Sequence, residues 1–200
     1  MQRVKVSAVS YLNTKPFLYG LENSSVKDFI ELSLDIPSVC AEKLINRQAE
    51  IGLVPVAAIP LIQDARIVSD FCIGAEGKVK TVNLYSQVPL SEVNKIFLDY
   101  QSRTSVLLVK LLAGKYWQIE PEWENASPGF IKEITNTSAG LVIGDRTFSL
   151  EGKFPFVYDL AEEWYKFTKL PFVFAAWVAN KDLPESFLQA FNEALSFGVH

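Results

Sequence analysis

The chain has 200 residues, of which 49% are hydrophobic and 21% are charged, and its formal net charge is −4 at pH 7. This composition is typical of a soluble globular protein, long enough to bury a substantial core in one large domain or two small ones. The acidic balance argues against nucleic acid or an anionic membrane surface as a partner, because neither attracts negative charge.

The chain start, the cysteines and the histidine restrict the compartment and the chemistry. Residues 1–5 lead directly into a strand pattern without an apolar signal region, and the longest apolar stretch, 171–179, is about half as long as a membrane-spanning helix. We therefore expect a cytoplasmic protein. Cys40 and Cys72 lack a C-x-x-C spacing, which favours buried free thiols, although a disulfide between them stays open. The only histidine is the terminal His200, so we expect neither imidazole catalysis nor a histidine-ligated metal.

The first twenty residues predict a strand, a tight turn and a helix. An alternating apolar run over 4–9 leads into the polar turn 13–15 and then into Pro16, which suits the first turn of a helix. In open α/β sheets the loops at the carboxyl ends of strands form the ligand crevice, and a helix start offers unpaired N–H groups. Asn13 and Thr14 therefore stand where a small anion would bind. The alternative is that they only cap the helix.

Strands and helices continue to alternate up to residue 73, which indicates a parallel α/β sheet. After a helix over 16–21, the pattern predicts strands over 29–34, 50–56 and 66–73, a helix over 37–45 and a helical turn over 57–62. Ser38 falls at the amino end of the helix over 37–45, again at a strand-to-helix corner. It either contacts a ligand there or caps the helix.

The pattern changes after residue 73, where a turn leads into a long alternating strand over 78–86 with no helix folding straight back. A second long strand is predicted over 171–179. Between and after them the pattern predicts strands over 95–98, 119–123 and 141–144 and helices over 103–113, 129–134, 160–167 and 183–197. This order predicts two α/β lobes joined by two crossing strands, with a ligand cleft between them. We place the first lobe at residues 1–86 and 174–200 and the second at residues 87–173.

The turn that begins at Asp99 carries a second group of candidate ligand contacts. Ser102 is a natural N-cap, and Thr104 and Ser105 fall in the first turn of an apolar helix. Hydroxyls, free amides and the Arg103 guanidinium would thus meet at one helix start, which suits a carboxylate or a phosphate. The alternative is a capped helix in which Arg103 pairs with Asp99.

Three further positions complete the candidate set. Ser86 ends the first crossing strand and should face the cleft, unless it only binds the backbone. Asp145 comes directly after the strand over 141–144 at the same rim, where it contacts a ligand or caps the next segment of the chain. The Tyr11 ring either packs in the core or forms the wall of a ring-binding slot. The residues alone thus indicate a two-lobed binder of a small organic anion, without a Gly-rich phosphate loop, nucleophile elbow or clustered metal ligands.

Seven segments of the chain match the pattern of a known family, in the family's order. They are VSYLNTKPF at 9–17, IGLVPV at 51–56, GAEGKV at 74–79, LYS at 84–86, Asp99 with SRTS at 102–105, IGD at 143–145 and LPFVFAAW at 170–177. In these segments the chain closely resembles the chorismate dehydratases of the futalosine route to menaquinone. The opening motif differs from that of the sister 1,4-dihydroxy-6-naphthoate synthases. The departures are Glu50, where the family usually has Asp, and a shorter C-terminus.

The resemblance implies a two-lobed type II periplasmic-binding-protein fold and a cytoplasmic, cofactor-independent carbon–oxygen lyase. Such an enzyme removes water from chorismate to give 3-[(1-carboxyvinyl)oxy]benzoate. A ring proton and the neighbouring hydroxyl leave, and aromatisation drives the reaction without a metal or a redox cofactor. The resemblance also implies that the substrate's own enolpyruvyl carboxylate removes the proton while protein groups hold it in place.

Carried onto this chain, the resemblance assigns the catalytic positioning to Asn13 and Ser86. The expected substrate contacts are the helix-start residues Ser38, Ser102, Thr104 and Ser105, which would hold the two carboxylates with help from Arg103, together with Tyr11, Thr14 and Asp145. The expected partner is a small dicarboxylate, with neither nucleic acid nor membrane. Two alternatives stay open at this point: a non-catalytic cytoplasmic binding protein for a small carboxylate, and the sister synthase.

Overall fold

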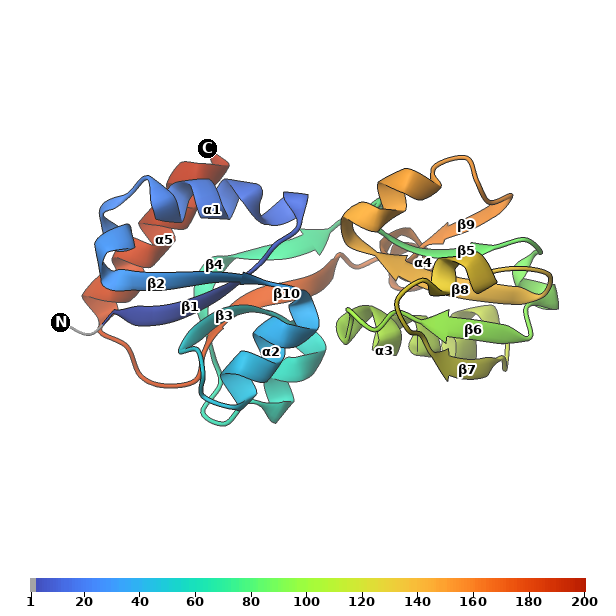
Figure 1. The fold of residues 1–200 in the computed structure, drawn as a ribbon, viewed down its shortest axis with the longest axis horizontal. Helices are drawn as coiled ribbons and strands as arrows, with labels where there is room; N and C mark the ends of the chain where they lie inside the picture. The colour runs from blue at the N-terminus through green and yellow to red at the C-terminus, as the bar shows by residue number, and fades with distance from the viewer. Residues whose placement is uncertain (1–2) are drawn as a thin grey trace. The chain divides into compact units, whose positions relative to one another are not determined.

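The computed structural model describes residues 3–200, which form two compact α/β units (Figure 1). The first unit is built from the chain up to Ile73 together with Val173–His200, and the second from Gly74–Phe172. Each unit has its own five-stranded sheet. The chain therefore passes from one unit to the other and back, and the predicted two-lobed α/β organisation is confirmed.

The sheet of the first unit has the strand order β2-β1-β3-β10-β4. Its strands are β1 (Val4–Val9), β2 (Ile30–Asp35), β3 (Ile51–Pro55), β4 (Arg66–Ala75) and β10 (Phe172–Ala179). β1 pairs in parallel with β2 and β3, and β10 runs antiparallel to β3. The carboxyl ends of β1, β2 and β3 consequently lie at one edge of this sheet, which we call the first ligand edge.

Helices cover both faces of this sheet. They are α1 (Lys15–Glu22), α2 (Pro37–Ile45) and α5 (Glu185–Val199), with 3-10 turns η1 (Leu12–Thr14), η2 (Ser25–Phe29) and η3 (Val56–Leu61). In Figure 1, α1 and α5 lie together on one face and α2 lies on the other. Beneath α1 and α5 the Trp177 ring is fully buried, with its centroid 6.1 Å from Phe17 and 5.2 Å from Phe191 in edge-on contacts. Trp177 therefore belongs to the core.

Two glycines allow α1 and α5 to pack closely. A β-carbon at Gly20 of α1 would overlap the carbonyl oxygen of Ala194, and one at Gly198 of α5 would overlap the carbonyl oxygen of Pro16. Backbone therefore packs against backbone along this helix pair, and no larger residue fits at either glycine without moving a helix.

The sheet of the second unit has the strand order β7-β6-β8-β5-β9. Its strands are β5 (Val82–Ser86), β6 (Lys95–Leu98), β7 (Glu122–Asn125), β8 (Ser138–Ile143) and β9 (Phe156–Asp159). The helical segments are η4 (Leu90–Glu92), α3 (Thr104–Leu112), η5 (Ala113–Trp117), η6 (Phe130–Glu133), η7 (Gly144–Leu150) and α4 (Leu160–Thr168). β6 runs parallel to β7 and β8, whereas β5 runs antiparallel to both β8 and β9. The carboxyl ends of β6, β7, β8 and β9 thus share one edge, the second ligand edge.

The structure places residues 74–86 in the second unit, whereas the sequence pattern placed them in the first. β5 pairs with β8 on one side and β9 on the other, so it is an inner strand of the second sheet. The alternation over 78–86 is not one continuous crossing strand either. Instead, the residues directly before β5 form a turn in which Lys80 has a φ of +67°. The strand that leads the chain out of the first unit is β4, which ends at Ala75. The sequence also missed β9, a four-residue strand that follows Pro155.

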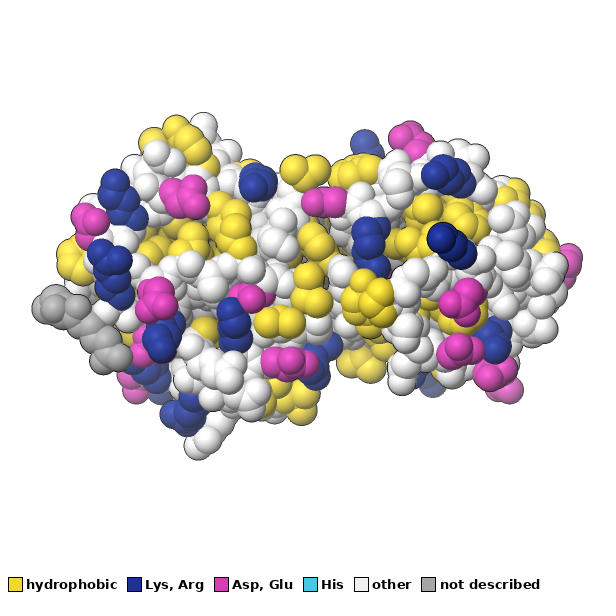
Figure 2. Space-filling model, in the orientation of Figure 1, with side chains coloured by type: hydrophobic (Ala, Val, Ile, Leu, Met, Phe, Trp, Pro, Cys, Tyr) yellow, Lys and Arg dark blue, Asp and Glu magenta, His cyan; other side chains and the backbone are white. Residues whose placement is uncertain are grey.

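Surface chemistry and the cysteines add two observations. On the face shown in Figure 2, basic and acidic side chains are interspersed rather than gathered into a patch of one sign.

Both cysteines are free; Cys40 is buried as expected, but Cys72 is exposed on β4. Within residues 3–200, no helix combines the length and the apolar character needed to cross a bilayer.

Candidate functional site

The turn between β1 and α1 forms the first corner of the first ligand edge. Thr14 is fully buried, and its hydroxyl donates to Oδ1 of the exposed Asn13 at 3.3 Å. The Thr14 amide donates to the carbonyl oxygen of Tyr11 at 3.1 Å, and the Tyr11 ring packs half-buried against the core. Thr14 stands at the N-cap position of α1 but makes no side-chain cap hydrogen bond. Its hydroxyl therefore orients Asn13 instead of capping the helix.

Ser38 occupies the second corner of the same edge. It is the second residue of α2, and no side chain caps this helix start, so the Ser38 amide has no acceptor within the helix. The parallel register sets Val9 beside Asp35, and the amide of Ser10 donates to the carbonyl oxygen of Asp35 at 2.9 Å. The structure thus brings the predicted residues Tyr11, Asn13, Thr14 and Ser38 to one edge of the first sheet.

A polar cluster that the sequence did not reveal lies between these two corners. Asp35 Oδ2 accepts hydrogen bonds from Ser7 Oγ (2.9 Å), Ser33 Oγ (2.9 Å) and Lys43 Nζ (2.6 Å). Burial alone would raise the pKa of Asp35, but the hydrogen bonds from Lys43, Ser7 and Ser33 outweigh it and bring the pKa below its ordinary value. Beside this carboxylate, burial raises the pKa of the Cys40 thiol to about 12. The cluster therefore holds one anion, one cation and a thiol that stays protonated.

In the second unit, Asp99 ties two turns of the second ligand edge together. The residue directly follows β6 and is 1% exposed. Its Oδ2 accepts hydrogen bonds from the Ile143 amide (2.9 Å) and from Arg146 Nη2 (2.5 Å), and its Oδ1 accepts one from the Gln101 amide (3.0 Å). The partner of Asp99 is thus Arg146, and not Arg103 as the capped-helix alternative supposed. Arg146 also lies over the Tyr100 ring, 5.4 Å from its centroid.

The start of α3 lies in the turn that Asp99 anchors. The helix begins at Thr104 with Arg103 in the N-cap position, one residue later than predicted. Ser102 Oγ accepts a hydrogen bond from the Ser105 amide at 3.1 Å, so this hydroxyl serves as a cap. Thr104 and Ser105 are both buried. The predicted group Ser102, Arg103, Thr104 and Ser105 therefore stays together at the second ligand edge.

Asp145 lies at the same edge, in the turn that comes after β8. It is the second residue of η7 and is half-buried. Gly144, directly before it, has a φ of +69°, a conformation that favours glycine. Because β8 neighbours β6 in the sheet, Asp145 belongs with the residues of the Asp99 turn, as predicted from the sequence.

Ser86 lies at the opposite end of β5 from this edge. Because β5 is antiparallel, Ser86 sits beside Ala139 and Phe156, near the amino ends of β8 and β9. It lies about 13 Å along β5 from the edge that carries Asp145. Its buried hydroxyl accepts a hydrogen bond from the Val88 amide at 3.1 Å. The carboxyl end of a strand lies at the second ligand edge only in β6, β7, β8 and β9, which run in the same direction. β5 runs antiparallel to them, so its carboxyl end, at Ser86, lies at the opposite edge of the sheet.

Thr81 is the hydroxyl residue that β5 does bring to the second ligand edge. It precedes Val82, which pairs with Ile143, and its carbonyl oxygen accepts a hydrogen bond from the Gly144 amide at 2.8 Å. The preceding turn is anchored by Asp159, which accepts hydrogen bonds from the amides of Val79 (3.2 Å) and Lys80 (2.6 Å) and also caps α4. Sequence reasoning missed Thr81 because only the strand direction distinguishes its end of β5 from the end at Ser86.

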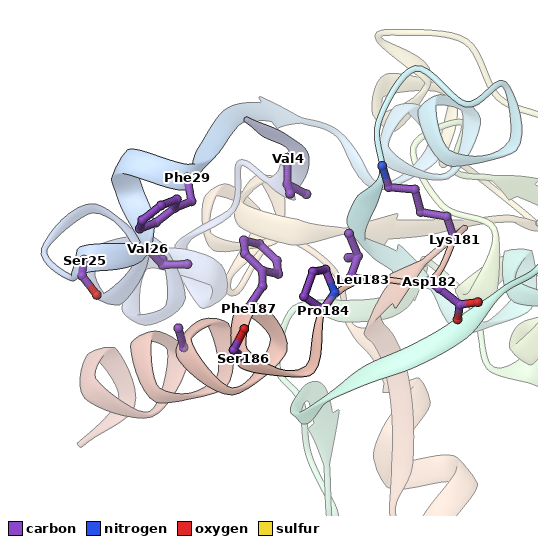
Figure 3. A pocket seen from close by; sticks show the side chains of 11 residues that line it. Val4, Ser25, Val26, Phe29, Lys181, Asp182, Leu183, Pro184, Ser186 and Phe187 are labelled. Carbon is purple, nitrogen blue, oxygen red and sulfur yellow. The ribbon is translucent and has the colours of Figure 1, made fainter. Parts of the chain in front are cut away.

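A cavity of about 500 Å³ lies in the first unit, away from the first ligand edge (Figure 3). Its walls include Val4 at the amino end of β1, Phe29 of η2, Phe187 of α5 and the segment just after β10. None of the predicted site residues lines it. Among residues 3–200, no three side chains of the metal-binding kinds come together so as to hold an ion.

Residues 4–200 match a family model described as menaquinone biosynthesis. Over 153 residues the chain is 31% identical to the chorismate dehydratase of Thermus thermophilus, an alignment that covers 66% of this chain and 55% of that protein. The chain therefore spans about half the length of this curated relative.

Solved structures show the same architecture. Protein AF1704 from Archaeoglobus fulgidus superposes with a TM-score of 0.73 at 18% identity, over 98% of this chain and 76% of that one. The Candida albicans CA3427 gene product, described as having the generic periplasmic binding protein structural fold, superposes with a TM-score of 0.58 at 11% identity, over 100% of this chain and 71% of its own. These likenesses confirm the predicted two-lobed periplasmic-binding-protein fold. Together with the family match over 4–200, they lead to one conclusion: the chain belongs to the menaquinone biosynthesis family.

Proposed function

We propose that the chain acts as a chorismate dehydratase, removing water from chorismate to give 3-[(1-carboxyvinyl)oxy]benzoate. The observation that carries the proposal is the 31% identity to a curated chorismate dehydratase, within a family match over residues 4–200. The geometry of each ligand edge, taken by itself, is in keeping with an anionic substrate, because each edge presents a helix start at which a carboxylate can bind.

In the first unit, the first ligand edge offers a binding position for a carboxylate of the substrate. The Ser38 amide and hydroxyl lie at the positive end of the α2 dipole, where a carboxylate is stabilised. Asn13 has its Oδ1 bound by Thr14, and its Nδ2 makes no hydrogen bond within residues 3–200. An amide held in this way is suited to orient a reacting group of the substrate.

In the second unit, the second ligand edge likewise offers a binding position for a carboxylate of the substrate. We assign the carboxylate to the start of α3, with Arg103, Thr104 and Ser105, because charge-assisted hydrogen bonds are the strongest available there. Asp145, in the turn after β8, and Thr81, directly before β5, lie at the same edge. We give Thr81 the positioning role that the family resemblance implied for Ser86, since Thr81 stands at the end of β5 that lies at this edge.

The elimination itself needs a base and a path for the hydroxyl. The ring C–H and the neighbouring C–O bond break, a ring double bond forms, and the proton and hydroxide leave as one water. The buried carboxylates at these edges are poorly placed as bases: Asp35 is paired with Lys43 and its pKa is lowered, and Asp99 is paired with Arg146. This supports the substrate's own enolpyruvyl carboxylate as the proton acceptor, with the protein supplying orientation.

Incubating the purified chain with chorismate and following the product by mass spectrometry tests the proposal. We expect a product that has lost one water and has the ultraviolet spectrum of a substituted benzoate. A folded sample that binds chorismate and returns it unchanged would contradict the proposal and would favour a non-catalytic carboxylate-binding protein.

A further inference from the structure

Asp35 is the residue at which the two corners of the first ligand edge are joined. Its backbone carbonyl oxygen holds the Ser10 amide, the first residue of the turn that carries Asn13. Its side chain reaches β1 through Ser7 and α2 through Lys43. One residue therefore connects the turn before α1 to the helix whose first turn carries Ser38.

The charges of this cluster bear directly on an anionic ligand. Asp35 lies three residues before Ser38, so a bare carboxylate there would repel a bound carboxylate and oppose the α2 dipole. The groups that face it are Ser7 of β1, Ser33 of β2, and Lys43 and the Cys40 thiol of α2. Among these groups Lys43 carries the compensating charge, at 2.6 Å, with 28% of its side chain and 14% of that of Asp35 exposed.

We propose that Asp35 and Lys43 are a positioning pair for the first ligand edge: Asp35 fixes the spacing of its two corners, and Lys43 cancels the carboxylate's charge so that an anion can bind beside it. The effect on substrate rests on the proposed function, whereas the effect on the two corners does not. As positioning residues, they contribute to affinity and to local order.

The substrate arm compares Lys43→Met, Asp35→Asn and the double variant with the original chain, measuring KM and kcat for chorismate between pH 5.5 and 8. Lys43→Met should raise KM about tenfold near pH 8 and leave kcat within about threefold, because an uncompensated carboxylate now opposes the ligand. The double variant should recover most of the loss, because it removes the carboxylate charge together with the lysine.

A matched control is Lys166→Met, which breaks a comparable contact of 2.8 Å to Glu163 on α4 in the second unit. It should leave KM unchanged across the pH range. If Lys43→Met leaves KM unchanged, or if the double variant is as impaired as the single one, the proposal is overturned.

The second arm uses no ligand and so separates failure of this inference from failure of the proposed function. In Lys43→Met, amide hydrogen exchange at Ser10 and Cys40 should quicken at least about tenfold while exchange in β6 stays the same. Unchanged exchange at Ser10 and Cys40 would overturn the positioning role even if chorismate is turned over. Faster exchange in a chain that neither binds nor converts chorismate would support the positioning role of the pair and reject chorismate as the substrate.

Discussion

Asp99 and Arg146 form an ion pair at 2.5 Å in which the Asp99 side chain is completely buried and that of Arg146 is 27% exposed. The pair joins the turn after β6 to the turn after β8, and Asp99 also binds the Ile143 amide. The proposed contact Ser105 follows the first of these turns, at the start of α3, and Asp145 lies on the second. Their relative position therefore depends on this pair.

Arg146→Met should therefore destabilise the chain by about 3 kcal/mol or more, because it leaves a buried carboxylate without its counter-charge. Urea unfolding measures this loss. The control is Arg66→Met, which removes an ion pair with Asp182 whose side chains are both more than half exposed and should cost at most about 1 kcal/mol. Equal losses in the two variants would show that the Asp99–Arg146 pair is no more than a surface contact.

Thr81 and Ser86 stand at opposite ends of β5, and we expect them to have different roles. Thr81→Val should lower kcat/KM for chorismate about tenfold or more without changing stability, because it removes a hydroxyl at the second ligand edge. Ser86→Ala should leave kcat/KM close to that of the original chain and cost about 1 kcal/mol of stability, since it loses the hydrogen bond to Val88. The reverse pattern in steady-state kinetics would return the catalytic assignment to Ser86.

The difference between these two residues shows what the sequence can and cannot reveal. The corner at Asn13 and Thr14 was predictable because a polar turn and a proline follow an apolar strand, and the start of α3 was predictable for the same local reason. The Ser86 end of β5 could not be distinguished from the Thr81 end, because strand direction depends on which strands pair, and residues 78–86 do not encode that choice locally. The pairs Asp35–Lys43 and Asp99–Arg146 were not found, since each connects residues on different elements of the fold.

The close packing of α1 against α5 predicts a stability effect at Gly20. Gly20→Ala should cost about 1–3 kcal/mol, because its methyl group would overlap the backbone of Ala194. Thermal unfolding measures the effect. Gly114→Ala is the control: it has open space around it and no positive φ, so it should be neutral or slightly stabilising. A neutral Gly20→Ala would mean that the two helices pack less tightly than described.

Low pH should lower the free energy of unfolding of the first unit, because Asp35 becomes protonated. Its pKa in the folded chain lies below the ordinary value of about 3.9, so its contribution to stability is fully present above that value and is lost as the pH falls through the folded pKa. Urea unfolding between pH 6 and pH 2 should therefore show a steeper acid decline for the original chain than for Asp35→Asn. Parallel declines would contradict the lowered pKa.

The central claim is that chorismate is the substrate and that Asn13 orients it for loss of water. The most direct measurement is the rate of product formation from chorismate, by mass spectrometry, for the original chain and for Asn13→Ala, together with the affinity of each for chorismate. We predict that the original chain forms the dehydrated aromatic product, and that Asn13→Ala binds chorismate with similar affinity but turns it over at least about a hundredfold more slowly. Chorismate recovered unchanged from the original chain, or equal turnover by both, would contradict the account.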